Sequence, residues 1–268
     1  MSAIYDTIGR SYRTTRRADP RVLSTLIRWL AVSPPATLCD VGAGSGNYTN
    51  ALCDSGFRVL AVEPSETMRS QAPAREGVTW IKGSAEAIPI ADAQAAAVVC
   101  TLAAHHFSDL ASAAREMERI CPDGPFVFFT FDPHRGEQQW FLRYFPQIQA
   151  ADLAIFPAVE DFAATIGKVT GRVADVLDFP LPPDLVDHFM YAPWATPETY
   201  LDPSFRANTS GFAKADATLV EAQVALLAED LATGRWDAEF GHFRVAKQND
   251  AGFCFVRFRP RQRGRKWV

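Results

Sequence analysis

Short apolar runs alternate with amphipathic stretches from residue 36 to residue 133. The runs have the length of strands, and the stretches between them repeat apolar residues every three or four positions, as helices do. This pattern predicts a parallel, doubly wound α/β sheet. Its strands are expected at 37–41, 58–63, 78–82, 96–102 and 126–131, and its helices near 46–54, 65–72 and 109–120.

A helix is also predicted ahead of the first strand, over about 20–32, because Asp19-Pro20 supplies a cap and a first-turn proline. Beyond Pro133 the chain becomes rich in aromatic residues and mostly helical. We therefore divide one structural domain by role into residues 1–133, which bind a cofactor, and residues 134–268. The second part is expected to supply helices around 137–150, 159–168 and 184–240, and strands over 172–179 and 253–258.

The stretch from 36 to 46, Ala-Thr-Leu-Cys-Asp-Val-Gly-Ala-Gly-Ser-Gly, ends in an acid and three glycines at alternate positions. Glycine adopts a positive φ without steric cost, and its missing Cβ lets the backbone approach a ligand closely. Gly42, Gly44 and Gly46 therefore predict a bare loop that leaves a strand and enters a helix. Because open α/β sheets bind ligands at the carboxyl ends of their strands, the first hypothesis is a nucleotide-like cofactor.

The next strand ends at Glu63, roughly 20 residues after Asp40, as expected for an acid that binds a ribose. A carboxylate there can accept hydrogen bonds from both ribose hydroxyls. The loop reads Gly-x-Gly-x-Gly, however, and lacks the spacing of the dinucleotide fingerprint, in which a helix N-terminus holds a pyrophosphate. A nicotinamide-dependent oxidoreductase stays as an alternative, since it shares the strand, the glycine loop and the distal acid.

Five segments in order resemble the class I S-adenosylmethionine-dependent methyltransferases, in particular small-molecule, methyltransferase type 11-like members. They are Asp40 to Gly46, Val62-Glu63-Pro64-Ser65, Gly83-Ser84-Ala85-Glu86-Ala87-Ile88-Pro89, Ala97 to Phe107 and Glu116 to Gly124. The resemblance implies a Rossmann-like seven-stranded sheet, mostly parallel with an antiparallel last strand, and a helical cap inserted between the last two strands. It also implies S-adenosylmethionine as cofactor and a small-molecule methyl acceptor, at oxygen, nitrogen or carbon, in specialised metabolism.

The same resemblance assigns the cofactor-binding residues. The loop backbone at Gly42, Ala43, Gly44 and Gly46 contacts the methionine part, Asp40 organises that end, and Glu63 with Pro64 takes the ribose. The other residues it implies are Ser84, Ala85 and Glu86 beside the adenine, Met68 against its face, Thr101 and Leu102 after the fourth strand, and Tyr5, Tyr12 and Arg16 in an N-terminal lid. For Met68, ordinary packing between helix and sheet is an equal alternative.

Methyl transfer requires alignment and exclusion of water, and requires a base where the acceptor must lose a proton. His105 and His106 follow the fourth strand, where the family places the methyl donor near the acceptor, and His106 is slightly favoured as that base. Neighbours in an extended segment point to opposite sides, so one of the two is expected to face the cofactor. Either could instead orient the loop, and a protein that binds the cofactor without transferring methyl is a third alternative.

Composition and charge limit the binding partners and the cellular compartment that we expect for this protein. The 268 residues are 48% hydrophobic and carry a net charge of −4, which allows a large core and gives no general attraction to nucleic acid. Five dispersed cysteines fit a reducing compartment, and the lack of a signal core or of an apolar run of about 18 residues predicts a cytoplasmic protein without a membrane partner. The histidines show no metal-ligand spacing, so we expect no metal, and we expect a monomer or homodimer.

Overall fold

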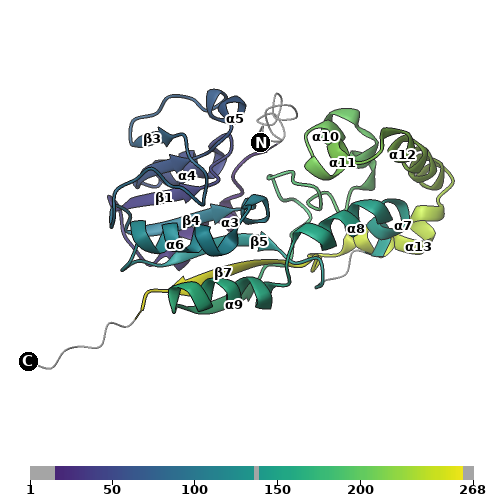
Figure 1. Ribbon diagram of the computed structural model, residues 1–268. Helices are drawn as coiled ribbons and strands as arrows, with labels where there is room; N and C mark the ends of the chain where they lie inside the picture. The colour runs from purple at the N-terminus through teal and green to yellow at the C-terminus, as the bar shows by residue number, and fades with distance from the viewer. Residues whose placement is uncertain (1–15, 136–138, 262–268) are drawn as a thin grey trace, which may run out of the picture. The chain divides into compact units, whose positions relative to one another are not determined.

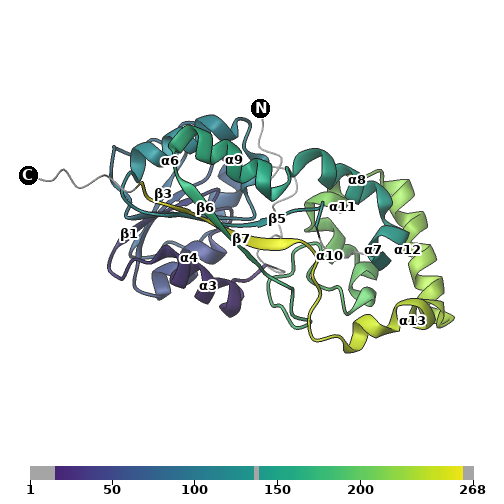
Figure 2. The same cartoon turned by 90° about the horizontal axis from the view of Figure 1, so that it is seen from below.

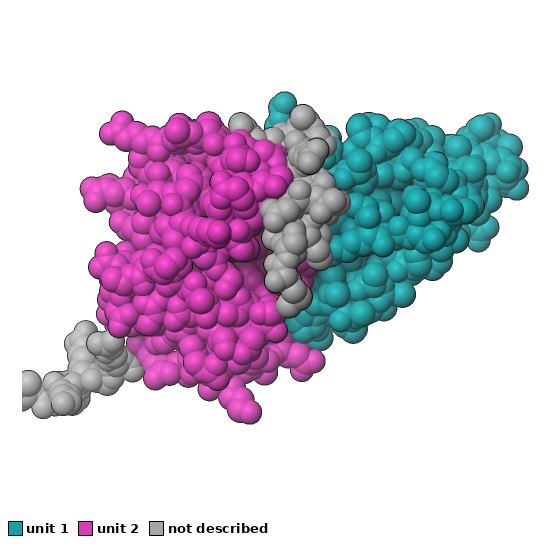
Figure 3. All heavy atoms as spheres, turned by 45° about the horizontal axis from the view of Figure 1, so that its top comes forward, with its two compact units in different colours: residues 1–19, 131–158, 178–254 teal, residues 20–130, 159–177, 255–268 magenta. Residues whose placement is uncertain are grey.

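The computed structural model describes residues 16–135 and 139–261. The chain forms two compact units, which interleave along the sequence and are coloured separately in Figure 3. The sheet unit comprises residues 20–130, 159–177 and 255–268, and the aromatic unit comprises residues 1–19, 131–158 and 178–254. The chain passes from the sheet unit to the aromatic unit after residue 130, and it returns to the sheet unit at residues 159 and 255.

Seven strands of the described chain form one sheet in the order β3-β2-β1-β4-β5-β7-β6 (Figure 1). The sheet is mostly parallel, with antiparallel pairing confined to the last strands, which confirms the predicted fold class. Its strands are β1 (Thr37–Val41), β2 (Arg58–Val62), β3 (Val78–Ile81), β4 (Ala97–Thr101), β5 (Phe126–Phe131), β6 (Val173–Asp178) and β7 (Phe253–Arg259).

The register of the central strands places the candidate residues at one edge of the sheet. Val41 at the end of β1 pairs with Val62 at the end of β2, and Val62 pairs in turn with Ile81 at the end of β3. The glycine loop and Glu63 therefore leave adjacent strands side by side. The strand order also reverses between β1 and β4, which is the switch point where open α/β sheets bind ligands.

Helices cover both faces of the sheet, as Figure 2 shows. One face carries α3 (Pro20–Leu30) and α4 (Asn47–Asp54), and the other carries α6 (Leu110–Ile120) and α9 (Val159–Thr170). All six residues of β5 and the first four of β4 are buried. This burial on both faces explains why these two strands are apolar almost throughout. The short elements α5 (Glu66–Ser70) and η2 (Ala104–His106) follow β2 and β4.

A buried arginine holds the turn between α6 and β5. The Arg172 guanidinium is fully buried and donates to the carbonyls of Gly124 at 2.5 Å, Cys121 at 2.7 Å and Pro122 at 3.1 Å. It also donates to Glu118 Oε2 at 2.6 Å and lies over the Phe126 ring. The turn Cys121-Pro122-Asp123-Gly124 is thus fixed by a side chain that is distant in the sequence.

The aromatic unit contains many of the predicted helices, but the helical prediction over 184–240 is wrong for residues 184–196, which form turns and irregular structure. Edge-to-face aromatic pairs form its core, for example Trp140 with Tyr200 at 5.3 Å and with Trp236 at 5.6 Å between ring centroids. The helix over 217–232 buries Val220, Val224 and Leu227. The elements of this unit are α7 (Gln139–Tyr144), α8 (Pro146–Ile155), η3 (Pro197–Leu201), α10 (Pro203–Ala207), α11 (Ser210–Lys214), α12 (Ala217–Ala232), α13 (Arg235–Phe240) and η4 (Gly241–Val245).

None of the helices in the described ranges has the length and apolar character that crossing a lipid bilayer requires.

Candidate functional site

The glycine loop has the conformation that its sequence predicts. Gly42, Gly44 and Gly46 have φ values of 77°, 56° and 86°, in the left-handed region that side chains disfavour. A Cβ added at Gly42 would lie 2.5 Å from the Cβ of Ala103, so this glycine also allows two loops to pack together. At Gly44 a Cβ would meet only the Met68 Cε, at 3.4 Å. The loop is therefore bare at Gly44, where a ligand can approach the backbone.

The Glu63 carboxylate is held by hydrogen bonds from two backbone amides. Its side chain is almost fully buried, at 7% exposure. Oε2 accepts a hydrogen bond from the Gly44 amide at 3.0 Å, and Oε1 accepts one from the Ser65 amide at 2.9 Å. Each carboxylate oxygen can accept a further hydrogen bond, so the group can receive two hydroxyls in a fixed orientation. This geometry suits a ribose diol.

Asp40 lies at the end of β1 and is buried, with 2% exposure. Its Oδ2 accepts a hydrogen bond from the Thr49 hydroxyl at 2.6 Å. Burial raises the pKa of Asp40 to about 6, the Thr49 hydrogen bond opposes this rise, and the charge of Glu63 adds to it. A cationic ligand group near Asp40 would favour its ionised form, so the site is suited to an ammonium or sulfonium.

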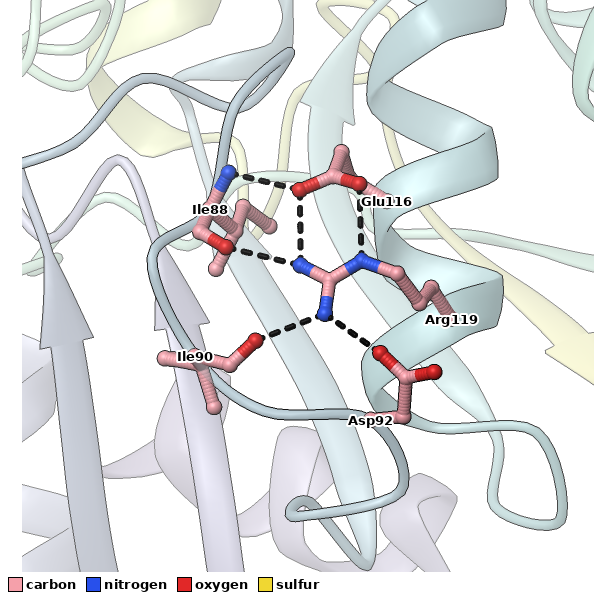
Figure 4. A network of polar contacts seen from close by, with 5 residues as sticks. All are labelled: Ile88, Ile90, Asp92, Glu116 and Arg119. Atoms are coloured by element: carbon pink, nitrogen blue, oxygen red, sulfur yellow. Dashed lines mark hydrogen bonds and ion pairs between the residues drawn. The ribbon is translucent and has the colours of Figure 1, made fainter.

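Residues 84–89, which belong to the segment expected to bind the adenine, are held by hydrogen bonds with two side chains of α6 (Figure 4). Glu116 Oε2 accepts from the Ile88 amide at 2.8 Å, while Arg119 donates to the carbonyls of Ile88 at 2.7 Å and Ile90 at 2.6 Å. Within the segment a bridge pairs Ser84 with Ala87, and Ala85 is buried. The predicted adenine-binding residues are thus held in a rigid loop.

The two candidate histidines follow β4 in a strained segment. Leu102, directly after the strand, has a φ of 51°, which is uncommon outside glycine and is frequent at functional sites. His105 and His106 lie in η2, and their ring centroids are 3.8 Å apart. The expectation that an extended backbone sends the two rings to opposite sides is therefore wrong, because a 3₁₀ turn brings them together.

The remaining predicted residues have varied surroundings. Met68 is buried on α5 with its methyl group near Gly44, and the Ala43 amide donates to the Val62 carbonyl at 3.1 Å. Arg16 donates two hydrogen bonds to Asp187, which is buried within the aromatic unit. Tyr5 and Tyr12 lie outside the described residues, and Pro64 lies between β2 and α5.

Two residues that were not predicted, Thr49 and Ser45, complete the edge of the sheet together with the predicted Thr101. Thr49 is fully buried and bonds to Asp40. The Ser45 and Thr101 hydroxyls are buried, and neither has a hydrogen-bond partner in the structure. A hydroxyl in the first helical turn after a glycine loop is the sequence signal that could have indicated Thr49. The two unpaired hydroxyls have no such local signal, although Thr101 was predicted to contact the cofactor.

The fold and this edge are those of an α/β protein suited to a nucleoside-containing cofactor, with two buried carboxylates beside a glycine loop that lacks the spacing of a pyrophosphate-binding fingerprint. Comparison with known proteins narrows the class. Residues 39–129 match the family described as a methyltransferase domain. A putative methyltransferase from an antibiotic biosynthesis pathway of Anabaena variabilis is 36% identical in its crystal structure, with a TM-score of 0.89 over 91% of this chain and 98% of that chain. The chain belongs to the class I S-adenosylmethionine-dependent methyltransferases, and S-adenosylmethionine is its cofactor.

Other relatives are more distant. The malonyl-[acyl-carrier protein] O-methyltransferase of Pseudescherichia vulneris is 27% identical over 131 residues, which are 48% of this chain and 52% of that protein. The chain thus spans about half the length of the curated relatives that it matches. The geranyl diphosphate C-methyltransferase of Streptomyces coelicolor is 15% identical, with a TM-score of 0.53 over 89% of this chain and 77% of that chain, and shares the fold alone.

The residues at the edge fit this cofactor. Polar groups for a ligand without phosphates are available in the hydroxyls of Ser45 and Thr101, which are buried and unpaired, and in the fixed carboxylate of Glu63. The backbone at Gly44 is open to the ligand. Among the residues that the structure describes, no group of three or more histidine, cysteine, aspartate or glutamate side chains could hold a metal ion.

Proposed function

We propose that the protein transfers a methyl group from S-adenosylmethionine to a small-molecule acceptor in specialised metabolism. The observation that carries this proposal is the geometry of Glu63, a buried carboxylate held by the Gly44 and Ser65 amides beside a bare glycine loop. The choice of specialised metabolism is supported by the likeness to the Anabaena variabilis protein, which extends over almost all of both chains. When bound, the cofactor supplies an electrophilic methyl carbon on a sulfonium.

Each residue of the site then has a defined task. Glu63 accepts the two ribose hydroxyls, and Asp40 with the loop at Gly44 receives the charged methionine end. Ser84 to Glu86 border the adenine, with Met68 against its face, since a thioether packs well on an aromatic ring. Because the loops are already held by hydrogen bonds within the protein, they need little reorganisation on binding, which favours alignment of the reacting groups.

The two histidines after β4 are the candidates for the base that removes a proton from the methyl acceptor. Where the acceptor is a hydroxyl or an ammonium, a base must take its proton, and imidazole is suited to this near neutral pH. His105 and His106 lie directly after the strand that ends at Thr101, with their rings in contact. We propose His106 for this role, with His105 as its neighbour in the same turn.

Four variants and a panel of acceptors test the proposal. The purified chain is incubated with S-adenosylmethionine and a panel of phenols, amines and carboxylic acids, and products are examined by mass spectrometry for the gain of one methyl group. Glu63→Gln should abolish the gain through lost cofactor affinity, whereas His106→Asn should reduce turnover with cofactor affinity unchanged. His105→Asn should have the smaller effect of the two histidine variants. As a matched control, Glu66→Gln removes an exposed carboxylate three residues from Glu63 and should change neither quantity.

Two outcomes would overturn the proposal in different ways. Binding of S-adenosylhomocysteine without methylation of any acceptor, across a panel that includes the pathway's own intermediates, would indicate a protein that holds the cofactor without transfer. Binding of NADH in place of S-adenosylhomocysteine would contradict the cofactor itself. We further propose a cytoplasmic location, because all five cysteines are free and four of them, Cys39, Cys100, Cys121 and Cys254, are buried thiols.

A further inference from the structure

Glu86 makes contacts that binding of the adenine does not require. Its Oε1 accepts hydrogen bonds from the Ser108 amide at 2.6 Å, the Ser108 hydroxyl at 3.1 Å and the Asp109 amide at 3.3 Å. Residues 108 and 109 lie directly after η2, which carries the two histidines. One carboxylate oxygen in the cofactor segment therefore holds the far end of the histidine loop, which we define as residues 102–109.

These bonds do not serve to cap α6. Asp109 is the N-cap of that helix, and its own side chain accepts from the Ala111 amide at 2.9 Å and from the Ser112 hydroxyl. The helix is thus already capped by a local residue. Glu86 instead bonds to the amides of the N-cap residue and of the residue before it, which belong to the loop. The purpose of the contact is to place the histidine loop.

The near end of the same loop rests on the glycine loop. The Leu102 amide donates to the Phe129 carbonyl at 2.8 Å, and Ala103 packs against Gly42 so closely that a Cβ on Gly42 would lie 2.5 Å from the Ala103 Cβ. Each end of the histidine loop therefore contacts a segment to which the proposed function assigns a part of the cofactor, the glycine loop at one end and Glu86 at the other.

We propose that Glu86 is a positioning residue that couples occupation of the cofactor site to the placement of His105 and His106. The inference rests on the proposed function, in which the segment 84–86 borders the adenine. Cofactor bound against this segment restrains Glu86, and Glu86 restrains the loop through its Oε1. The histidines are then in place when the methyl donor is present, and the loop is freer when the donor is absent.

Hydrogen–deuterium exchange of the full chain tests this coupling without any need for turnover. Exchange in peptides covering 102–109 is measured with and without S-adenosylhomocysteine in the parent and in Glu86→Ala. In the parent the ligand should slow exchange in this loop. Loss of a hydrogen bond to a charged acceptor should speed exchange roughly tenfold in Glu86→Ala, and the ligand should no longer slow it. Glu86→Gln keeps an oxygen that can accept from the same amides, and should restore much of the protection.

Glu116→Gln is the matched control, because it loosens the same segment at Ile88 without touching the histidine loop. It should weaken binding of S-adenosylhomocysteine and leave exchange at 102–109 as in the parent. In turnover, Glu86→Ala should lower kcat about tenfold and displace the pH profile, since the histidines lose their fixed surroundings, whereas Glu116→Gln should raise the KM for S-adenosylmethionine alone.

Unchanged exchange at 102–109 in Glu86→Ala would overturn the inference and leave Glu86 as a simple cofactor ligand. Should that variant fail to fold, Glu86→Asp keeps the charge on a side chain one methylene shorter, and parent-like protection in this variant would count equally against the coupling. Absence of methylation in the parent together with intact ligand-dependent protection would contradict the proposed function and not the coupling.

Discussion

The Glu63→Gln substitution is the sharpest perturbation of the site, because it preserves shape while removing the charge. In the parent the two carboxylate oxygens accept from the Gly44 amide at 3.0 Å and the Ser65 amide at 2.9 Å. A glutamine side chain has one oxygen and one NH₂ group, so one of these two amides would face a donor. A hydrogen bond to a charged group contributes about 1.5–3 kcal/mol. We therefore expect the free energy of unfolding to fall by about 2 kcal/mol.

The cost to cofactor binding is larger, because both ribose hydroxyls lose a charged acceptor. Two weakened bonds of this kind amount to about 3 kcal/mol, which is roughly a hundredfold in Kd. Isothermal titration calorimetry with S-adenosylhomocysteine measures the loss directly. A second ligand, the 2′-deoxy analogue, closes a double-mutant cycle that isolates the contact between Glu63 and the ribose from any general loosening of the loop.

One outcome of this double-mutant cycle would refute the contact between Glu63 and the ribose. Removal of the 2′-hydroxyl should weaken binding by about 1.5 kcal/mol or more in the parent and by much less in Glu63→Gln. Equal losses in both proteins would show that Glu63 does not contact the ribose. Glu66→Gln, which removes an exposed carboxylate on the next helix, should bind both ligands as the parent does.

Three further perturbations follow from the sheet unit. The folded-state pKa of Asp40, about 6, lies above the unfolded value of about 3.9, so its contribution to stability is fully present below about pH 4 and is lost as pH rises through 6. Asp40→Asn should remove about 3 kcal/mol of this pH dependence, as urea unfolding between pH 4 and pH 7 would reveal. Arg172→Ala leaves Glu118 and three carbonyls without their donor and should lower the unfolding free energy by about 3–5 kcal/mol, and Arg172→Lys should not restore it, since one ammonium cannot reach all four acceptors. Gly42→Ala combines a φ of 77° with a clash at Ala103, so it should lower both the melting temperature and cofactor affinity, and parent-like values would contradict the close packing of the two loops.

The predicted strands agree closely with the observed ones because their signals are local. Continuous apolar runs give the buried strands β4 and β5, and three glycines at alternate positions give a loop in which all three have positive φ. The strand bounds differ from the predictions by one or two residues at most, as for β2 and β7. The sequence alone therefore determines the sheet, its loop and the position of the acid at residue 63.

Other features of the site could be established only from the folded structure. The extended segment expected at the two histidines is a 3₁₀ turn with a strained Leu102, because its path is set by packing against Gly42. Glu63 and Glu86 accept hydrogen bonds from backbone amides. Every residue except proline has such an amide, so the sequence does not indicate which residues are the partners.

The sequence by itself determined the fold class, the glycine loop and the position of the acid that we propose binds the ribose, since hydrophobic periodicity and the conformational freedom of glycine are properties of neighbouring residues. Only the tertiary structure decided how these parts hold one another. Arg172 reaches the turn at Gly124 and Glu86 reaches Ser108 across long stretches of chain. Such contacts depend on strand register and on the packing of loops, which a single sequence does not specify.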